Sequence, residues 1–242
     1  MISALDIAFP MGKRHLKSII EELLKEFMTL TLYHYVHCPY CVRVRMALGY
    51  LNLDFTSKVL PYEDEHTPTS LIGKKMLPIL VHGQKVLNES LDIIKYVDEN
   101  HELEVSEVIS SEIFQKVEVL LTNIATPIHS LAMPYWIYTP EFTEVSRRYF
   151  QKKKEEKRGS FSSLVQNRSH FENEVQLQLE SLEKRLVPFY ESSAFGLLDI
   201  LIASHLWGLY VVPEFHFSEK MHDYLQTIKK LCRFNYHKDF WG

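Results

Sequence analysis

The sequence is poor in cysteine, has no surplus of basic charge and contains no long apolar run. Its three cysteines are too few for the disulfide framework of a small secreted domain. A net charge of −4 offers little attraction to the phosphates of a nucleic acid, so no nucleic-acid partner is expected. No segment reaches the roughly 18 consecutive apolar residues of a membrane span, which predicts that no part of the chain is integral to a membrane.

What the sequence does have is enough length and apolar content for a sizeable core. With 242 residues, 46% of them hydrophobic, it is long enough for one large domain or two modest ones. Segment 1–28 differs in pattern from the rest. Its apolar residues recur at helical spacing, which indicates an amphipathic helix that could pack on the body, on a partner or on a membrane surface. A secretory signal is not expected, because Asp6 comes early and the basic residues come late.

The strongest chemical signal is a pair of cysteines two residues apart, in the run Cys38-Pro39-Tyr40-Cys41. An apolar, β-branched and aromatic run before it predicts a buried strand over 29–36, and helical spacing after it predicts a helix over 39–51. Both cysteines are therefore expected where a strand turns into a helix. The free N–H groups and the positive dipole end of a helix start favour a thiolate, which is the reactive form of the sulfur.

Disulfide exchange is the chemistry that this pair supports best. Cys38, nearer the helix start, is expected to be the attacking thiolate, and Cys41, one turn further in, to resolve mixed disulfides. A zinc site would need further ligands, and Cys232 is alone, so no metal is expected. Inert packing of the pair is the remaining alternative. A close reactive pair also fits a reducing compartment, and we expect a cytoplasmic protein.

The next segments complete a small α/β domain. Strands are predicted over 55–60, 77–81 and 85–87, a short helix ends at Gly73, and a further helix covers 89–100. The order βαβαββα over 29–103 implies a parallel pair joined by a right-handed crossover. On the first helix Arg43 and Arg45 are expected to point away from the apolar stripe.

After residue 103 every apolar run has helical spacing, so 104–242 is expected to be an all-helical domain. The predicted helices cover 106–131, 141–157, 161–190, 197–212 and 218–231, with an aromatic connection over 134–140. The aromatic residues over Met133–Tyr138 could line a substrate cleft between the domains or simply pack there. The charged run Lys152–Arg158 is expected to be a solvated helix face, and Cys232 a buried small hydrophobe.

Two weaker signals lie in the first domain. A cis bond before Pro78 would turn the Leu77 backbone toward the cysteines, where it could pair with a peptide-like thiol; Pro78 could equally be an ordinary edge-strand residue. Glu89 and Ser90 stand at a helix start, where free N–H groups suit a carboxylate. The alternative for this second pair is an ordinary acidic first turn with a capping role.

Together these motifs resemble the bacterial glutaredoxin 2 family. The resemblance rests on residues 33–46, Thr67-Pro68, residues 76–80, and Glu89-Ser90 with the helix that follows, and it covers 28–242. It implies a thioredoxin-like N-terminal domain and an all-helical C-terminal domain like those of glutathione transferases. Because members begin a few residues before the first strand, Met28 is a second candidate for the biological start, which would make the preceding residues a mis-called extension.

The resemblance also implies a function. A glutathione-dependent thiol-disulfide oxidoreductase is expected, with glutathione as co-substrate and with glutathionylated or disulfide-bonded proteins as partners. Cys38 would become glutathionylated, and Cys41 would serve when a protein disulfide is reduced. Two alternatives remain: a cysteine-type glutathione transferase or dehydroascorbate reductase, which would need only Cys38, and a non-enzymatic redox-sensing binding protein. We expect a monomer.

The same resemblance implies a glutathione site. The Leu77 backbone beside a cis-Pro78 would hold the cysteinyl part of glutathione, and Glu89 with Ser90 would hold its γ-glutamyl end. Tyr40 and His37 would line the approach. One departure from related folds is a glycine, Gly196, where a serine or threonine usually caps the helix that contains Asp199. Glycine tolerates a cap position at a cost of only a few tenths of a kcal/mol, roughly, so the fold is expected to be unaffected.

Overall fold

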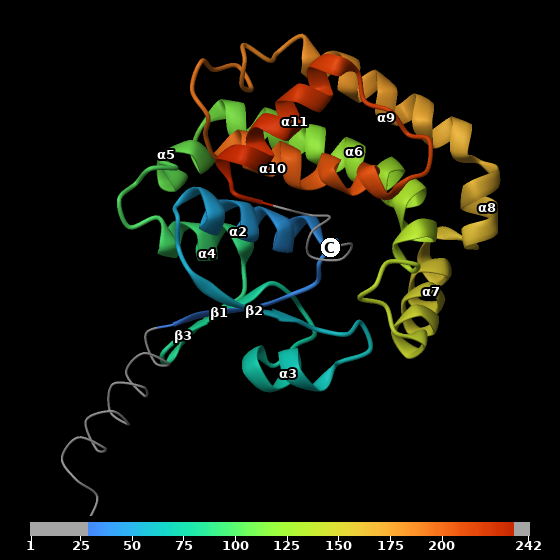
Figure 1. The fold of residues 1–242 in the computed structure, drawn as a ribbon, viewed down its shortest axis with the longest axis horizontal. Helices are drawn as coiled ribbons and strands as arrows, with labels where there is room; N and C mark the ends of the chain where they lie inside the picture. The colour runs from blue at the N-terminus through green and yellow to red at the C-terminus, as the bar shows by residue number, and fades with distance from the viewer. Residues whose placement is uncertain (1–28, 235–242) are drawn as a thin grey trace, which may run out of the picture.

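The computed structural model describes residues 29–234, so the predictions made for segment 1–28 lie outside the described residues. A small sheet with its helices forms the first part of the chain, and helices alone form the second (Figure 1). None of the described helices combines the length and the apolar character needed to cross a bilayer.

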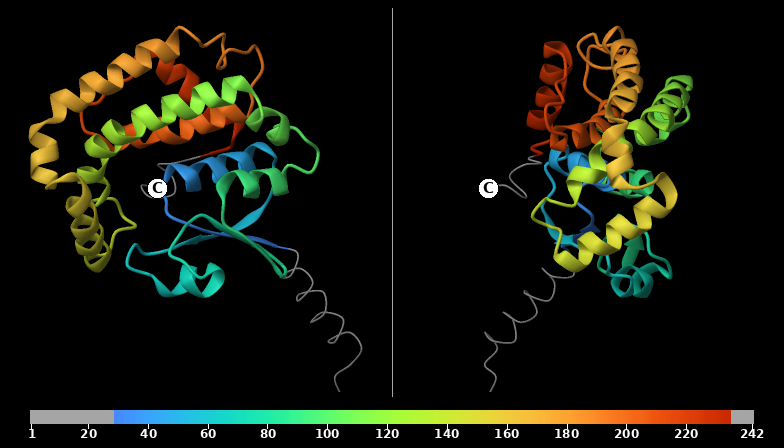
Figure 2. Two further views of the ribbon diagram at one scale, coloured as in Figure 1. Left: turned by 180° about the vertical axis from the view of Figure 1, so that it is seen from behind. Right: turned by 90° about the vertical axis from the view of Figure 1, so that its right-hand side faces the viewer.

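A four-stranded mixed sheet, in the order β2-β1-β3-β4, organises the first part. β1 pairs in parallel with β2, β3 runs antiparallel to β1, and β4 forms a hairpin with β3. α2 and α4 cover one face of the sheet and α3 lies on the other (Figures 1 and 2). This is the expected thioredoxin-like order of elements, with bounds β1 (Leu30–His34), α2 (Pro39–Tyr50), β2 (Phe55–Val59), α3 (His66–Ile72), β3 (Ile79–His82), β4 (Lys85–Leu87) and α4 (Ser90–Val97).

α2 is buried on nearly every side because it lies between the sheet and α10 (Figure 1). Arg43 and Arg45, expected to point away from the apolar stripe of this helix, are nevertheless both buried. The Arg43 guanidinium lies 4.6 Å from the centre of the Tyr40 ring, and that of Arg45 lies 4.8 Å from the ring of Phe234. The helical second part covers the face of α2 that a single small domain would leave in water. Each of the two guanidinium groups on α2 lies against an aromatic ring.

The second part is helical throughout the described residues, as expected for a glutathione-transferase-like domain. Four of its helices begin at a serine or threonine whose side chain accepts a backbone N–H of the first turn; these cap residues are Ser111, Thr143, Ser160 and Ser218. The elements are α5 (Val105–Ile109), α6 (Glu112–Trp136), α7 (Glu144–Arg158), α8 (Phe161–Gln166), α9 (Arg168–Glu183), α10 (Leu197–Leu206), the 3₁₀ turn η1 (Trp207–Val211) and α11 (Glu219–Leu231).

Two of the predicted helices differ from the observed ones. The helix expected over 106–131 is two helices, because Ser111 caps a new start, and the second runs on through two prolines to Trp136. Part of the expected aromatic connection is therefore helix. The helix expected over 161–190 is interrupted at Asn167, whose side-chain amide donates to the carbonyl of Ser163, and it ends at Glu183. Beyond it the chain turns back through an isolated bridge between Leu186 and Tyr190.

Asp199 stabilises the start of α10, whose N-cap residue is the glycine Gly196. One carboxylate oxygen accepts the Gly196 N–H at 3.0 Å, and the other accepts the Tyr190 N–H at 2.9 Å and the Tyr224 hydroxyl at 2.8 Å. The carboxylate is buried, so these three bonds replace the water it has lost. Half of a capping box is thus enough to begin this helix.

Candidate active site

The two cysteines occupy unequal positions at the start of α2. Cys38 is the N-cap residue, and its carbonyl accepts the N–H groups of Cys41 and Val42, each at 2.9 Å. Cys38 is half-buried, whereas Cys41 is fully buried; neither is in a disulfide. The proline after Cys38 takes the first helical position, where its missing N–H costs nothing. The predicted strand-to-helix placement of the pair is confirmed.

The electrostatics of the pair separate the two sulfurs further. A hydrogen bond from the Cys41 thiol, together with the N–H groups of Cys41 and Tyr40, lowers the pKa of Cys38 to about 7, against the opposing effect of burial. Burial and the neighbouring Cys38 sulfur raise the pKa of Cys41 well above its ordinary value. Near neutral pH Cys38 is therefore partly a thiolate, while Cys41 keeps its proton.

Cys38 opens into a cleft of about 490 Å³ that both parts of the chain build, here called the cysteine cleft. The first part contributes the start of α2 and the segment before β3, and the second part contributes the end of α6 and one face of α7. Its lining residues are Tyr35, Cys38, Pro39, Tyr40, Tyr62, Lys75, Met76, Leu77, His129, Met133, Trp136, Tyr149, Phe150, Lys153, Lys154 and Lys157.

Some of the residues predicted for the glutathione site line this cleft. Tyr40, with 51% of its surface exposed, and Leu77 are both on its wall. The Leu77-Pro78 peptide is cis, and Pro78 is buried. The ladder between β1 and β3 extends only to the pair Tyr33 and Ile79, which leaves the Leu77 backbone outside it. An extended peptide could therefore align with this backbone.

Glu89 and Ser90 stand apart from this group. Glu89 is the exposed N-cap residue of α4, where its side chain makes no capping bond, and Ser90 is the buried first residue of the helix. Neither is on the wall of the cysteine cleft. The structure thus brings Cys38, Tyr40 and Leu77 together, and it leaves Glu89 and Ser90 beyond the edge of that cleft.

α7 contributes lysines to the cleft wall that were not predicted from the sequence. Lys153, Lys154 and Lys157 line the cleft, so the expectation that Lys152–Arg158 forms only a solvated helix face is wrong. The signal was present in the spacing: these lysines follow Tyr149 and Phe150 by three to eight positions and share their side of the helix. What the spacing could not show was that this side faces a cysteine more than a hundred positions earlier in the chain.

Polar contacts hold α7 against the segment that precedes β3. The Lys75 ammonium donates to the Tyr62 carbonyl at 2.6 Å and to the Tyr149 hydroxyl at 2.8 Å. That hydroxyl donates to Glu65 at 2.6 Å, and Ser146 donates to Glu63. The bond from Lys75 to Tyr62 lies within the first part of the chain, whereas the bonds made by Tyr149 and Ser146 join α7 to the first part at the side of the cleft.

His37 does not line the approach to Cys38, contrary to expectation. It is buried, where it contacts Glu141 and lies 3.3 Å from the Thr139 hydroxyl. Burial, assisted by the positive charge of Arg45, lowers the pKa of His37 to about 3, and burial raises the pKa of Glu141 to about 7. The residue next to the reactive cysteine thus joins the two parts of the chain, on the side of Cys38 away from solvent.

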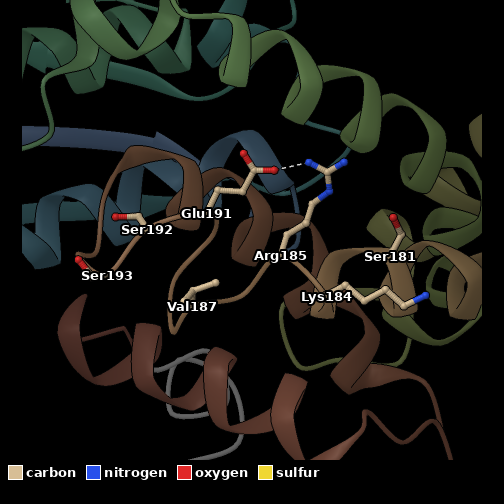
Figure 3. Close-up of a pocket in the computed structure, with 7 residues that line it drawn as sticks. All are labelled: Ser181, Lys184, Arg185, Val187, Glu191, Ser192 and Ser193. Carbon is tan, nitrogen blue, oxygen red and sulfur yellow. Dashed lines mark hydrogen bonds and ion pairs between the residues drawn. The ribbon is translucent and has the colours of Figure 1, made fainter.

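The aromatic segment over 133–138 divides between the two roles considered for it. Met133 and Trp136 line the cleft, whereas Tyr138 is 70% exposed and lies outside it. A larger hollow lies elsewhere, at the end of α9 and the turn after it, where Arg185 pairs with Glu191 (Figure 3). Its lining residues include neither cysteine nor histidine. Within residues 29–234 no group of three or more potential ligands is arranged to hold a metal ion.

Comparison with known proteins gives a consistent relationship. A family model for the glutathione S-transferase N-terminal domain matches residues 32–105, and one for the glutaredoxin 2 C-terminal domain matches residues 116–239. Glutaredoxin 2 of Escherichia coli strain K12 is 29% identical over 211 residues, which is 85% of this chain and 97% of that protein.

Solved structures agree with the sequence matches. Glutaredoxin 2 from Salmonella typhimurium, in complex with glutathione, is 31% identical, with a TM-score of 0.76 over 87% of this chain and 98% of that chain. A glutathione S-transferase from Ceriporiopsis subvermispora shares only the fold, with 15% identity and a TM-score of 0.67 over 85% of this chain and 98% of that chain.

Proposed function

This chain belongs to the glutaredoxin 2 family, and on that premise we propose that it is a glutathione-dependent thiol-disulfide oxidoreductase. Its substrates are protein–glutathione mixed disulfides and some protein disulfides, and it acts in the cytoplasm. One observation carries the proposal. A half-buried cysteine whose thiol has a pKa of about 7 lies in a cleft beside a buried thiol whose pKa is raised. Dithiol exchange requires this difference, because one thiolate attacks the substrate and the second thiol later resolves the mixed disulfide.

The reaction on a mixed disulfide needs only Cys38. Its thiolate attacks the glutathione sulfur, the sulfur–sulfur bond of the substrate breaks, and the protein thiol leaves with the electron pair and takes up a proton. A second glutathione, as thiolate, then attacks the glutathione sulfur bound to Cys38. Oxidised glutathione forms, and Cys38 returns as a thiolate. The protein sulfur of the mixed disulfide is thus reduced and the sulfur of the second glutathione is oxidised.

A protein disulfide needs the second cysteine. Cys38 attacks one sulfur and forms a mixed disulfide with the substrate. Its negative charge is then lost, which removes one of the causes that raise the pKa of Cys41. Cys41 attacks the Cys38 sulfur, the substrate leaves fully reduced, and the disulfide between Cys38 and Cys41 is reduced by two glutathione molecules.

Glutathione binding is assigned in this proposal to both predicted groups of residues. The Leu77 backbone beside Pro78 pairs with the cysteinyl part of the tripeptide, and Tyr40 covers it. The free N–H groups at the start of α4, with Glu89 and Ser90, receive the γ-glutamyl end. Support for this comes from the Leu77 backbone lying outside the β-ladder and from the glutathione held by the Salmonella relative.

A set of cysteine variants tests the proposal. We expect Cys38→Ser to lose all glutathione-coupled reduction of a small mixed disulfide, and Cys41→Ser to retain it while losing reduction of a protein disulfide. Wild-type protein assayed with both substrates is the reference. Full activity of Cys38→Ser on the mixed disulfide would refute the mechanism.

A cysteine-type glutathione transferase is the second candidate, favoured by the match of residues 32–105 to a glutathione S-transferase domain. It would add glutathione to an electrophile through Cys38 and would not need Cys41. Conjugation of a chlorinated aromatic electrophile, measured beside disulfide reduction on the same preparation, separates the two. Conjugation that rivals disulfide reduction in rate would favour the transferase.

A further inference from the structure

The cysteine cleft carries one sign of charge. Four lysines line it, and among its described lining residues there is no aspartate or glutamate. The chain as a whole is acidic, with a net charge of −4. The wall of the cleft that contains Cys38 is therefore locally positive although the whole chain is acidic. A cleft with low-dielectric walls and charge of one sign focuses its field on whatever approaches.

The four lysines differ in the contacts that their ammonium groups already make. Lys75 is held by Tyr62 and Tyr149, and its ammonium lies 3.7 Å from Glu65. Lys154 is half-buried with its ammonium 5.3 Å from the centre of the Phe150 ring, and burial lowers its pKa. Lys153 and Lys157 are exposed. None of the three α7 lysines forms an ion pair with a described carboxylate.

Glu65 is the acidic side chain that interacts with this face of α7: the hydrogen bond from Tyr149, with the charges of Lys75 and Lys153, lowers its pKa. Glu155 is turned to the other side, where it accepts from Gln151 at 3.0 Å and from the N–H of Phe161 at 2.8 Å. Lys153 and Lys157 are four positions apart, about one helical turn, and so form a short row along the edge of the cleft. We name Lys153, Lys154 and Lys157 the lysine face.

We propose that the lysine face selects acidic substrates: it contacts aspartate and glutamate side chains that flank the modified cysteine of a glutathionylated protein. This inference rests on the proposed function. The geometry favours a protein partner over glutathione alone, because Lys153 and Lys157 stand exposed at the rim. The cleft itself receives the glutathionyl group, and the protein part of the mixed disulfide must emerge past that rim.

The interaction acts mainly on the rate of encounter. Exposed lysines gain little from a single ion pair, but a row of them steers an acidic partner toward the cleft, and salt screens the effect. At low ionic strength we expect the kcat/KM for an acidic glutathionylated peptide to exceed that for a neutral one by about tenfold. Near an ionic strength of about 0.5 M the ratio should approach one.

The test compares two glutathionylated peptides of equal length, one with aspartate and glutamate around the modified cysteine and one with asparagine and glutamine. Wild type, Lys153→Glu and Lys157→Glu are assayed with both at low and high salt. Lys152→Glu is the matched control, because Lys152 is an exposed neighbour on the same helix and is not on the cleft wall. Each cleft variant should lower the acidic-to-neutral ratio about threefold or more, while Lys152→Glu should leave the ratio near that of wild type.

Four outcomes would overturn the inference. Equal kcat/KM for the two peptides in wild type at low salt would remove the selectivity itself. An equal loss on both peptides in Lys153→Glu and Lys157→Glu would mean that the lysines serve only glutathione. The same loss of ratio in Lys152→Glu would assign the effect to net charge rather than to the cleft. Failure to reduce either peptide would refute the proposed function, and this inference with it.

Discussion

At the scale of single residues, two cysteines with the same side chain become chemically different through their positions. Cys38 caps a helix at the wall of a cleft, and Cys41 lies inside the same turn without access to water. The thiol of one lowers the pKa of the other by a hydrogen bond. The third cysteine, Cys232, is fully buried and burial raises its pKa, so it has no part in exchange and the prediction of a buried small hydrophobe is confirmed.

Alkylation with iodoacetamide should follow the pKa of Cys38. Its rate in the folded protein should rise as pH increases through about 7 and level off above it, because only the thiolate reacts. Peptide mass spectrometry at limiting reagent identifies the modified residue, which should be Cys38 with little reaction at Cys41 or Cys232. Loss of the hydrogen bond in Cys41→Ala should move the midpoint upward, and Cys41→Ser, which keeps a donor, should move it less. A wild-type midpoint near 9 would contradict the assigned electrostatics.

At the scale of elements, α2 is the helix that both parts of the chain share. Its residues from Cys41 to Leu48 are all buried, because the sheet covers one side and α10 and α11 approach the other. An amphipathic helix would leave one side in water. This helix instead belongs to the core of the whole molecule, and the position of the cysteines is fixed by both parts at once.

Gly49, near the end of α2, permits the closest of these contacts. A Cβ atom added there would overlap the carbonyl oxygen of Cys232, at the end of α11. Because backbone cannot yield as a flexible side chain can, Gly49→Ala should lower the free energy of unfolding by about 2 kcal/mol or more. Urea denaturation measures the change.

Gly196→Ala is the matched control for this substitution. Nothing lies within 4 Å of a Cβ added at Gly196, and its φ of −159° is open to any residue. Its effect should be far smaller than that of Gly49→Ala. Equal effects of the two substitutions would show that the contact between α2 and α11 is not as close as described.

At the scale of the whole molecule, several histidines are buried in the neutral form. His34, His37 and His205 are each at most 5% exposed, and burial lowers the pKa of each to about 3. In the unfolded chain they titrate near about 6.5. Below that pH the unfolded chain binds more protons than the folded protein. The free energy of unfolding therefore decreases as the pH is lowered. Glu141 acts oppositely: its raised pKa means that the folded protein gains its proton first.

Acidification should therefore destabilise the protein. Burial lowers the pKa of His129 to about 3 as well. Between pH 7 and pH 5 each of the four histidines destabilises the protein by roughly 2 kcal/mol and Glu141 offsets a similar amount, so a net loss of roughly 4–6 kcal/mol is expected in urea denaturation followed by tryptophan fluorescence. Glu141→Gln keeps a polar partner for His37 but cannot titrate, and it should lose more stability over the same range than wild type. Stability independent of pH across this interval would contradict the assignment of neutral buried histidines.

The sequence by itself determined the chemistry of the first part of the chain. Strand and helix periods predicted the βαβαββα order, and the spacing of Cys38 and Cys41 predicted two thiols at a helix start. These features depend on residues that are close together in the chain. Local hydrogen bonding and hydrophobic period can be predicted from such short segments. Helical spacing predicted the helical second part, and the family resemblance implied the cis bond before Pro78; the structure contains both.

Only the tertiary structure decided what surrounds the reactive sulfur. The cleft wall brings Cys38 together with lysines on α7, and a separate buried contact joins His37 to Glu141; each spans about a hundred positions of sequence or more. The burial of Arg43 and Arg45, and the closeness of Gly49 to Cys232, likewise depend on how the helical part lies against α2. The hydrophobic period of a segment shows which of its faces will be buried. It does not show which other element covers that face, because the hydrophobic effect is non-directional. The position of Cys38 at a helix start could be predicted from its neighbours in sequence, whereas the lysines on the wall of its cleft are neighbours only in space.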